Sequence, residues 1–149
     1  MCIRDRAYPP NSNPNVGLNV TVARKNFVST GLESFSKTYA KFLLNATTDN
    51  YLSINNNIGN YINLNWSKGV IFLNNDAKRF NSLSAEKQKA SITHEVGHAL
   101  KLCHSNDNLG VNETYFYPDS IMKKSNSTIS NSISLYDKSS LIKKWREMP

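Results

Sequence analysis

The three histidines of the chain, His94, His98 and His104, constrain its fold more than any other feature of the sequence. His94 and His98 are four residues apart, so on a helix they lie on one face and can bind one metal ion. His104 can reach the same ion if the helix ends near Lys101. Glu95 lies next to the pair, where a general base for a metal-activated water is needed. The spacing therefore predicts a helix, a turn and a metal site that joins them.

An ordinary amphipathic helix with solvent-exposed histidines is the alternative interpretation of this segment. A second stripe of apolar residues argues against it, because its members recur at helical spacing: Ile92, Val96, Ala99 and Cys103. This stripe lies about half a turn away from the two histidines, so the helix has a core side and a metal side. The predicted ion is zinc. Cys103 could also ligate zinc, but its place on the apolar stripe favours a buried thiol.

The segment 94–104 reads H-E-V-G-H-A-L-K-L-C-H and resembles the H-E-x-x-H-x-x-G-x-x-H signature of the metzincin zinc peptidases. The S-I-M at 120–122 resembles their Met-turn, a methionine beneath the zinc ligands. T-H-E-V-G-H-A-L and D-S-I-M are similar to the matrixin-like secreted peptidases of Gram-positive bacteria. The resemblance covers about residues 70–145 well and implies these roles: zinc ligation by His94, His98 and His104, general base catalysis by Glu95, and a hydrophobic floor made by Met122.

Lys101 is the one position at which the segment departs from the signature, because the family has glycine there. That glycine ends the helix and turns the chain so that the third histidine can reach the metal. A non-glycine residue in the left-handed conformation costs about 1–2 kcal/mol. A structural zinc site contributes on the order of 10 kcal/mol. We therefore expect the metal to hold the turn despite Lys101.

Residue patterns outside the histidine segment predict an α+β fold. Partial alternation predicts a strand over Val16–Ala23, and the capping-box pattern T-G-L-E begins a predicted helix over Gly31–Leu44. Three short strands are expected next, at Tyr51–Ile54, Tyr61–Trp66 and Val70–Leu73. This order resembles a metzincin-like zincin: a small twisted mixed β-sheet with an N-terminal helix, an active-site helix, a Met-turn and a C-terminal helix. In that family an exposed edge strand pairs with the substrate; Tyr61–Trp66 is a candidate, and an interior strand is its alternative.

Capping signals place the ends of the two later helices. Ser84 is a good N-cap for the zinc helix, with Glu86 in the first turn. Gly97 inside this helix suggests that another backbone segment approaches closely between the ligands, although a merely tolerated glycine is the alternative. The pattern S-L-Y-D at 134–137 caps a predicted last helix, which carries apolar residues at Leu141, Ile142 and Trp145.

The length of 149 residues predicts one domain with a single core. Residues 1–6 resemble a translated sequencing adapter and are set aside, so residues 7–149 are the predicted catalytic domain, with its native start and any signal peptide lost. The net charge of +7 comes from scattered lysines rather than a basic band, so nucleic acid is not an expected partner. No apolar run is long enough to span a membrane. A monomer is expected, and no dense acidic loop supports a calcium site.

These observations predict a secreted or cell-wall-associated zinc endopeptidase that cleaves a peptide or protein substrate with zinc-activated water and Glu95 as base. Two alternatives stay open. Glu113 or Asp119 could replace His104 as the third ligand, as acidic ligands do in other H-E-x-x-H peptidases. The chain could also be a zinc-stabilised binding domain without turnover, although an intact Glu95 argues against it.

Overall fold

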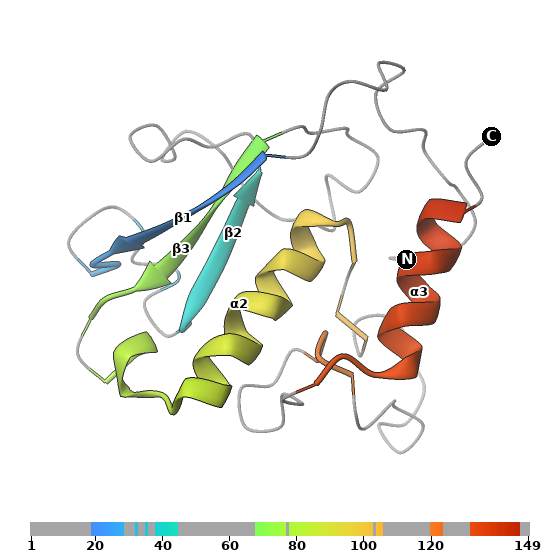
Figure 1. Cartoon of the computed structure of the whole chain (residues 1–149). Coiled ribbons are helices and arrows are strands. Elements are labelled where there is room, and N and C mark those ends of the chain that lie inside the picture. Colours follow the sequence, from blue (N-terminus) through green and yellow to red (C-terminus); the bar gives the residue numbers. More distant parts are fainter. Residues whose placement is uncertain are drawn as a thin grey trace, which may run out of the picture.

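The computed structural model describes residues 19–28, 32, 35, 38–44, 68–76, 78–102, 104–105, 120–123 and 132–146. In this part of the chain a three-stranded sheet lies beside helix α2, and helix α3 lies on the other side of α2 (Figure 1). The elements are β1 (Asn19–Lys25), β2 (Ala40–Leu44), β3 (Lys68–Asn74), the 3-10 turn η2 (Phe80–Ser82), α2 (Ala85–Ala99) and α3 (Leu135–Arg146). The mixed α+β class predicted from the sequence is confirmed at this level. Neither described helix combines the length and apolar character needed to cross a bilayer.

β3 is the central strand of the sheet. It runs parallel to β1 and antiparallel to β2, so the sheet is mixed as predicted. Ile71 pairs with Val22 on one side and with Phe42 on the other. Every residue of β3 after Lys68 is buried, as expected of a continuous apolar run covered on both faces. The predicted strand Val70–Leu73 is therefore confirmed as the middle of β3.

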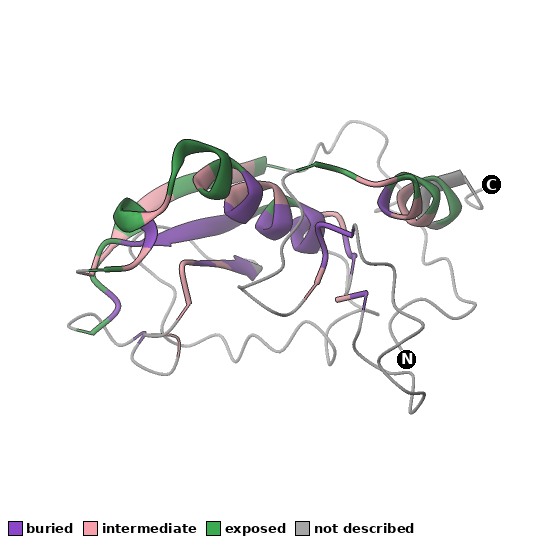
Figure 2. Cartoon of the chain, turned by 90° about the horizontal axis from the view of Figure 1, so that it is seen from below, coloured by how far each residue is buried: buried purple, intermediate pink, exposed green. Residues whose placement is uncertain are grey.

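The two faces of the sheet contribute to two separate apolar clusters, because successive side chains of a strand point to opposite faces. One cluster lies between the sheet and α2 and contains Ala40, Phe42, Ile71, Leu73, Phe80 and Ala99. The other contains Phe27, Leu32, Leu43, Val70 and Phe72. Burial of α2 increases from its exposed N-terminal turn to its C-terminal half, where the histidines lie (Figure 2). The sheet thus packs against α2 and fixes the position of its C-terminal half, which carries His94 and His98.

The predicted helix over Gly31–Leu44 is wrong for its last five residues, which form strand β2. The apolar residues Tyr39, Phe42 and Leu43 fit helical spacing, yet Phe42 and Leu43 are buried in opposite faces of the sheet. Pairing with β3 gives the backbone of this segment hydrogen-bond partners and buries its side chains on both faces of the sheet. A helix at this position would leave the edge of β3 unpaired. Tertiary pairing therefore overrides the local helical pattern.

The strand predicted over Val16–Ala23 is confirmed in kind, with its described part running from Asn19 to Lys25 as β1. Of its two valines, Val20 packs on the core whereas Val22 is 49% exposed. The strands predicted at Tyr51–Ile54 and Tyr61–Trp66 lie outside the described residues.

Helix α2 begins as the sequence predicts. Ser84 has extended backbone angles and its hydroxyl accepts a hydrogen bond from Lys87 N at 3.4 Å, with Glu86 in the first turn. The apolar stripe is confirmed in part, since Ile92 and Ala99 pack in the cluster beneath the sheet while Val96 is 37% exposed. Cys103 lies outside the described residues.

Helix α3 begins with the predicted capping box. Ser134 Oγ accepts from Asp137 N at 3.1 Å, and Asp137 Oδ2 accepts from Ser134 N at 2.9 Å and from Ser134 Oγ at 2.8 Å. The same carboxylate also reaches a distant turn, where it accepts from Ser120 Oγ at 2.6 Å and from Ile121 N at 3.0 Å. Leu141 adds an apolar contact to the cluster formed by that turn and α2. Asp137 therefore ties α3 to residues 120–122.

Burial raises the pKa of Asp137, but hydrogen bonds from Ser120, Ile121 and Ser134 outweigh it and hold the pKa below its ordinary value. Because the folded-state pKa is depressed, the stabilisation is complete above the ordinary value of 3.8 and is lost as pH falls through the folded-state pKa. We expect Asp137→Asn to lower the free energy of unfolding by about 2–4 kcal/mol near neutral pH, since bonds to a charged group are lost. The difference from wild type should shrink in acid.

Urea unfolding of both proteins from neutral to acidic pH measures this difference. Glu86→Gln, which removes an exposed carboxylate from α2, is the control for the change in charge. A difference between wild type and Asp137→Asn that stays constant down to acidic pH would contradict the role assigned to the Asp137 carboxylate.

Candidate metal centre

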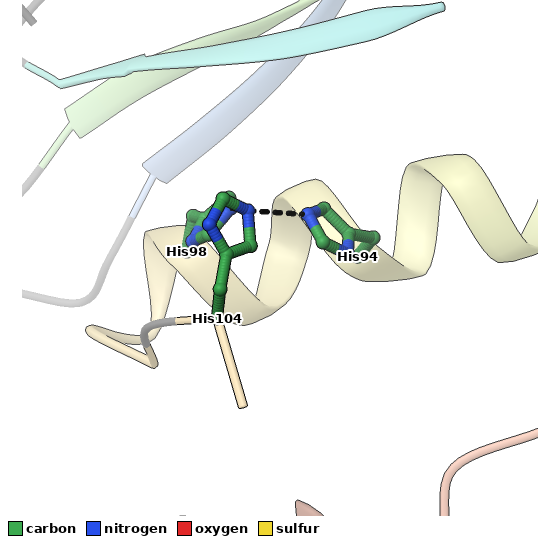
Figure 3. Close-up of side chains that lie close together, drawn as sticks. All are labelled: His94, His98 and His104. Atoms are coloured by element: carbon green, nitrogen blue, oxygen red, sulfur yellow. Dashed lines mark hydrogen bonds between the residues drawn. The ribbon is translucent and has the colours of Figure 1, made fainter. Parts of the chain in front are cut away.

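Two histidines of the candidate site come from α2 and the third from the chain that follows it. His94 and His98 are buried one turn apart near the end of the helix, and His104 returns to them after the turn at Lys101 (Figure 3). Their candidate ligand atoms all lie within 4.8 Å of one another. The three residues predicted from the sequence as metal ligands are therefore brought together, and they lie close enough to hold one metal ion.

The distances between the ring nitrogens suit a tetrahedral ion. His104 Nε2 lies 3.2 Å from His94 Nε2 and 3.2 Å from His98 Nε2. Zinc–nitrogen bonds of about 2.0–2.1 Å at a tetrahedral angle would separate two ligand nitrogens by about 3.3–3.4 Å. The observed separations are within a few tenths of an ångström of that value, so the donor set fits zinc.

Backbone carbonyls set the tautomers of the two helix histidines. His94 Nδ1 lies 2.7 Å from the Ile121 carbonyl oxygen, and His98 Nδ1 lies 2.9 Å from that of Leu102. A carbonyl oxygen only accepts, so each Nδ1 carries the proton and each Nε2 presents a lone pair toward His104. His104 Nε2 can carry one proton at most and cannot satisfy both. A shared cation satisfies all three nitrogens.

The electrostatic surroundings keep His98 neutral, as a metal ligand must be. Burial lowers its pKa well below the ordinary value, and the neighbouring His94 and His104 lower it further. The Leu102 carbonyl opposes this shift but does not reverse it. A neutral His98 can bind a cation at neutral pH without first losing a proton.

The turn that returns His104 to the site is a Schellman motif with Lys101 at its left-handed position. Lys101 has φ 65°, its N–H donates to His98 O at 2.9 Å, and Leu102 N–H donates to Gly97 O at 2.9 Å. Lys101 thus adopts the left-handed conformation that suits the glycine of the signature. The motif also places the Leu102 carbonyl next to His98 Nδ1, so the same turn ends the helix and orients one of the candidate ligands.

Glu95 lies between the histidines and strand β2. Its carboxylate is buried, and Oε2 accepts a hydrogen bond of 2.6 Å from Phe42 N on β2. Burial raises the pKa of Glu95, while His94, Lys41 and the Phe42 N–H lower it in part. The Phe42 N–H thus holds the Glu95 carboxylate in one orientation, on the residue that follows the candidate ligand His94.

Met122 fills the space beside Gly97, the residue between the helix ligands. It is fully buried with Ala90, Leu102 and Ile121, and a Cβ placed on Gly97 would overlap its Sδ. The close approach predicted at Gly97 is confirmed, but the prediction of a backbone segment is wrong, because a side chain makes it. The Met122 carbonyl also accepts a hydrogen bond from Ser105 N at 2.9 Å, so the turn at 120–122 holds the residue that follows His104.

Two parts of the site escaped the sequence analysis. The Phe42 N–H that holds Glu95 lies in a segment predicted as helix, and the bonds from Asp137 to the turn at 120–122 join residues far apart in the chain. For the second of these contacts the sequence offered two signals, Ser120 in S-I-M and Asp137 in the capping box. Glu113 and Asp119, the alternative third ligands, lie outside the described residues.

Comparisons with protein-family profiles, with curated proteins and with solved structures found no match to this chain.

The strain at Lys101 can be isolated by comparing Lys101→Gly with Lys101→Ala, which both remove the long side chain. We expect the glycine variant to be more stable than the alanine variant by about 1–2 kcal/mol, because only glycine adopts positive φ without strain. Chemical denaturation of the apo-protein measures the difference. Lys78, an exposed residue with φ 60° away from the site, provides a control pair with the same expected difference. Equal stability of Lys101→Gly and Lys101→Ala would contradict the assigned backbone strain.

The contact between Gly97 and Met122 predicts that the effect of Gly97→Ala on the free energy of unfolding changes sign when Met122 is replaced by alanine. Gly97→Ala should lower the free energy of unfolding by about 1–3 kcal/mol in the wild-type background, because the new methyl group collides with Met122. In the Met122→Ala background the same change should raise it by about 1 kcal/mol, the helix propensity gain of alanine over glycine. Urea denaturation of the four proteins gives the coupling. An equal loss of stability in both backgrounds would show that Met122 does not limit the space at Gly97.

Proposed function

We propose that this chain is a zinc-dependent endopeptidase of the metzincin type. One observation carries the proposal: the candidate ligand nitrogens of His94, His98 and His104 all lie within 4.8 Å of one another, and His104 Nε2 lies 3.2 Å from the Nε2 of each of the other two, as suits a tetrahedral ion. The resemblance of segments 94–104 and 120–122 to the metzincin signature and Met-turn supports the same conclusion. A matrixin-like, secreted protein is part of this proposal.

The number of ligands supports a catalytic rather than a purely structural ion. Structural zinc sites are usually closed by four protein ligands, whereas catalytic sites use three and leave one position for water or substrate. Among the described residues, the group that could hold an ion consists of the three histidines alone. Zinc bound there would supply Lewis acidity, lowering the pKa of an activated water and polarising the scissile carbonyl.

Glu95 is the residue that would handle the proton. Its position next to His94 places the carboxylate beside the ion, where it would accept the proton of the attacking water and pass it to the leaving amine. The Phe42 N–H holds one carboxylate oxygen in place, and burial raises the pKa of Glu95, which makes its carboxylate a stronger base. His94, His98 and His104 bind and orient, and take no part in this proton transfer.

Strand β2 is the candidate for binding the substrate backbone. It is an edge strand of the described sheet, it lies beside α2, and its Phe42 N–H already contacts the proposed base. An extended peptide added along such an edge would pass close to Glu95 and would be held by backbone hydrogen bonds. The edge strand suggested by the sequence, Tyr61–Trp66, lies outside the described residues.

A zinc-stabilised binding domain without turnover is the second candidate. The buried bond between Glu95 and Phe42 favours it, because a carboxylate that joins α2 to β2 has a structural use even without catalysis. The two functions differ in what the loss of the Glu95 charge would do. Catalysis requires the charge, whereas the structural bond requires only an oxygen that accepts from Phe42 N–H.

Glu95→Gln separates the two functions, because the amide oxygen can still accept from Phe42 N–H but cannot act as a base. We expect the variant to keep wild-type zinc content and stability while casein cleavage falls by about 10²–10⁴-fold, the usual contribution of a general base. Glu86→Gln, an exposed carboxylate on the same helix, is the control and should cleave normally. His104→Ala should lose both zinc and cleavage.

Zinc content is measured by metal analysis after dialysis, and cleavage by release of labelled peptides. Cleavage by Glu95→Gln at the wild-type rate would exclude Glu95 as the base. A wild-type protein that binds zinc at one equivalent but cleaves neither casein nor a broad peptide library would favour the binding domain.

A further inference from the structure

A chain of hydrogen bonds runs from α3 to a metal ligand and has no part in the proposed reaction. It begins at the buried carboxylate of Asp137, which accepts from Ser120 Oγ at 2.6 Å and from Ile121 N at 3.0 Å. Ser120 Oγ in turn accepts from Met122 N at 3.1 Å. The Ile121 carbonyl then lies 2.7 Å from His94 Nδ1. The Asp137 carboxylate, the Ser120 hydroxyl and the peptide unit between Ile121 and Met122 thus connect the start of α3 to His94.

The peptide unit between Ile121 and Met122 is the central part of this chain. Its C=O orients His94, and its N–H is held by the hydroxyl of Ser120. A peptide unit is planar, so holding the N–H also fixes the direction of the C=O. The orientation of His94 therefore depends on Ser120, whose hydroxyl is fixed by Asp137.

His98 is oriented in a different way. Its Nδ1 contacts the carbonyl of Leu102, which belongs to the turn at the end of the same helix. Local structure is enough to fix that carbonyl. The carbonyl that orients His94 comes instead from a segment remote in sequence, and needs its own support.

We propose that Ser120 and Asp137 are positioning residues for the metal ligand His94. The carboxylate fixes the Ser120 hydroxyl, the hydroxyl fixes the peptide unit, and the Ile121 carbonyl holds His94 with its Nε2 directed at the ion. In each hydrogen bond of the series, the acceptor lies on the side of the negative Asp137 carboxylate and the donor on the side of His94. The bonds therefore polarise one another, which makes the Ile121 carbonyl a stronger acceptor. Outer partners of this kind raise the basicity of a histidine ligand and fix its ring. This role rests on the metal centre of the proposed function and not on peptide hydrolysis.

Ser134 provides a matched control for Ser120. Each serine donates its hydroxyl to the Asp137 carboxylate, at 2.8 Å and 2.6 Å respectively, and each accepts from a backbone N–H at 3.1 Å. They differ in the segment they serve, since Ser134 caps α3 whereas Ser120 holds the peptide unit behind His94. Replacing either with alanine removes the same number of hydrogen bonds to Asp137.

The test compares Ser120→Ala and Ser134→Ala with wild type in the full chain, using Co²⁺ as the probe. Competition with a chelator gives the affinity for Co²⁺, and the visible absorption bands of the bound ion report its ligand geometry. We expect Ser120→Ala to weaken Co²⁺ binding about 10–100-fold and to shift the bands, while Ser134→Ala stays within about threefold of wild type with an unchanged spectrum. Denaturation of the two apo-variants checks that they lose similar stability.

Wild-type affinity and spectrum in Ser120→Ala would overturn the proposal, as would equal losses in Ser120→Ala and Ser134→Ala, which would mark a purely structural role. If Ser120→Ala does not fold, the ¹⁵N shifts of the His94 ring in the wild-type apo-protein serve instead: a ring whose Nδ1 carries no proton would overturn the proposal, because the Ile121 carbonyl would then hold nothing. A wild-type chain that binds no Co²⁺ would overturn both this role and the metal centre. A chain that binds Co²⁺ but cleaves no peptide would overturn only the peptidase, because neither readout depends on cleavage.

Discussion

The structure depends on the reversal of the chain at Lys101, because this turn converts two helical histidines into a three-ligand group. A helix alone can present His94 and His98, but a residue six positions after His98 would lie on another side of the helix and about 1.7 turns away. The Schellman motif stops the helix after Ala99 and returns His104 to within 3.2 Å of both partners. It also supplies the Leu102 carbonyl that orients His98. Lys101 occupies the left-handed position at a cost of about 1–2 kcal/mol, so the site is built on a strained residue.

The histidine segment could be predicted because its determinants are local. Helical spacing places His94 and His98 together, and Ser84 and the S-L-Y-D pattern mark helix starts through bonds made within one turn. Features set by tertiary contacts could not be predicted in the same way. Phe42 satisfies both helical and strand periodicity, and only pairing with β3 decides between them. The partner of Gly97 and the reach of Asp137 to Ser120 depend on how distant segments pack, which no local pattern encodes.

Glu95 connects α2 to the sheet, and this structural bond is compatible with the proposed role of Glu95 as a base. The Phe42 N–H fixes one carboxylate oxygen against β2, while Glu95 follows the candidate ligand His94 directly along the helix. Burial raises the pKa of Glu95, and His94, Lys41 and the Phe42 N–H offset this rise only in part. A raised pKa makes the carboxylate a stronger base. The bond to β2 holds the group in place, and burial strengthens it as a proton acceptor.

Metal binding at the proposed site would be coupled to folding, since the three candidate ligands come from two segments that an ion would join. The turn at 120–122 contacts both of them, through the Ile121 carbonyl at His94 and the Met122 carbonyl at Ser105 N. Ion binding to the folded form stabilises it by mass action, and any strain that binding must impose lowers the affinity by the same free energy. If the Lys101 turn formed only on binding, about 1–2 kcal/mol of strain would weaken the affinity roughly 5- to 30-fold. Contacts that form the turn before the ion arrives remove this penalty. The bonds from Leu102 N and Lys101 N to the helix, together with Met122 packed beside Gly97, are contacts of that kind.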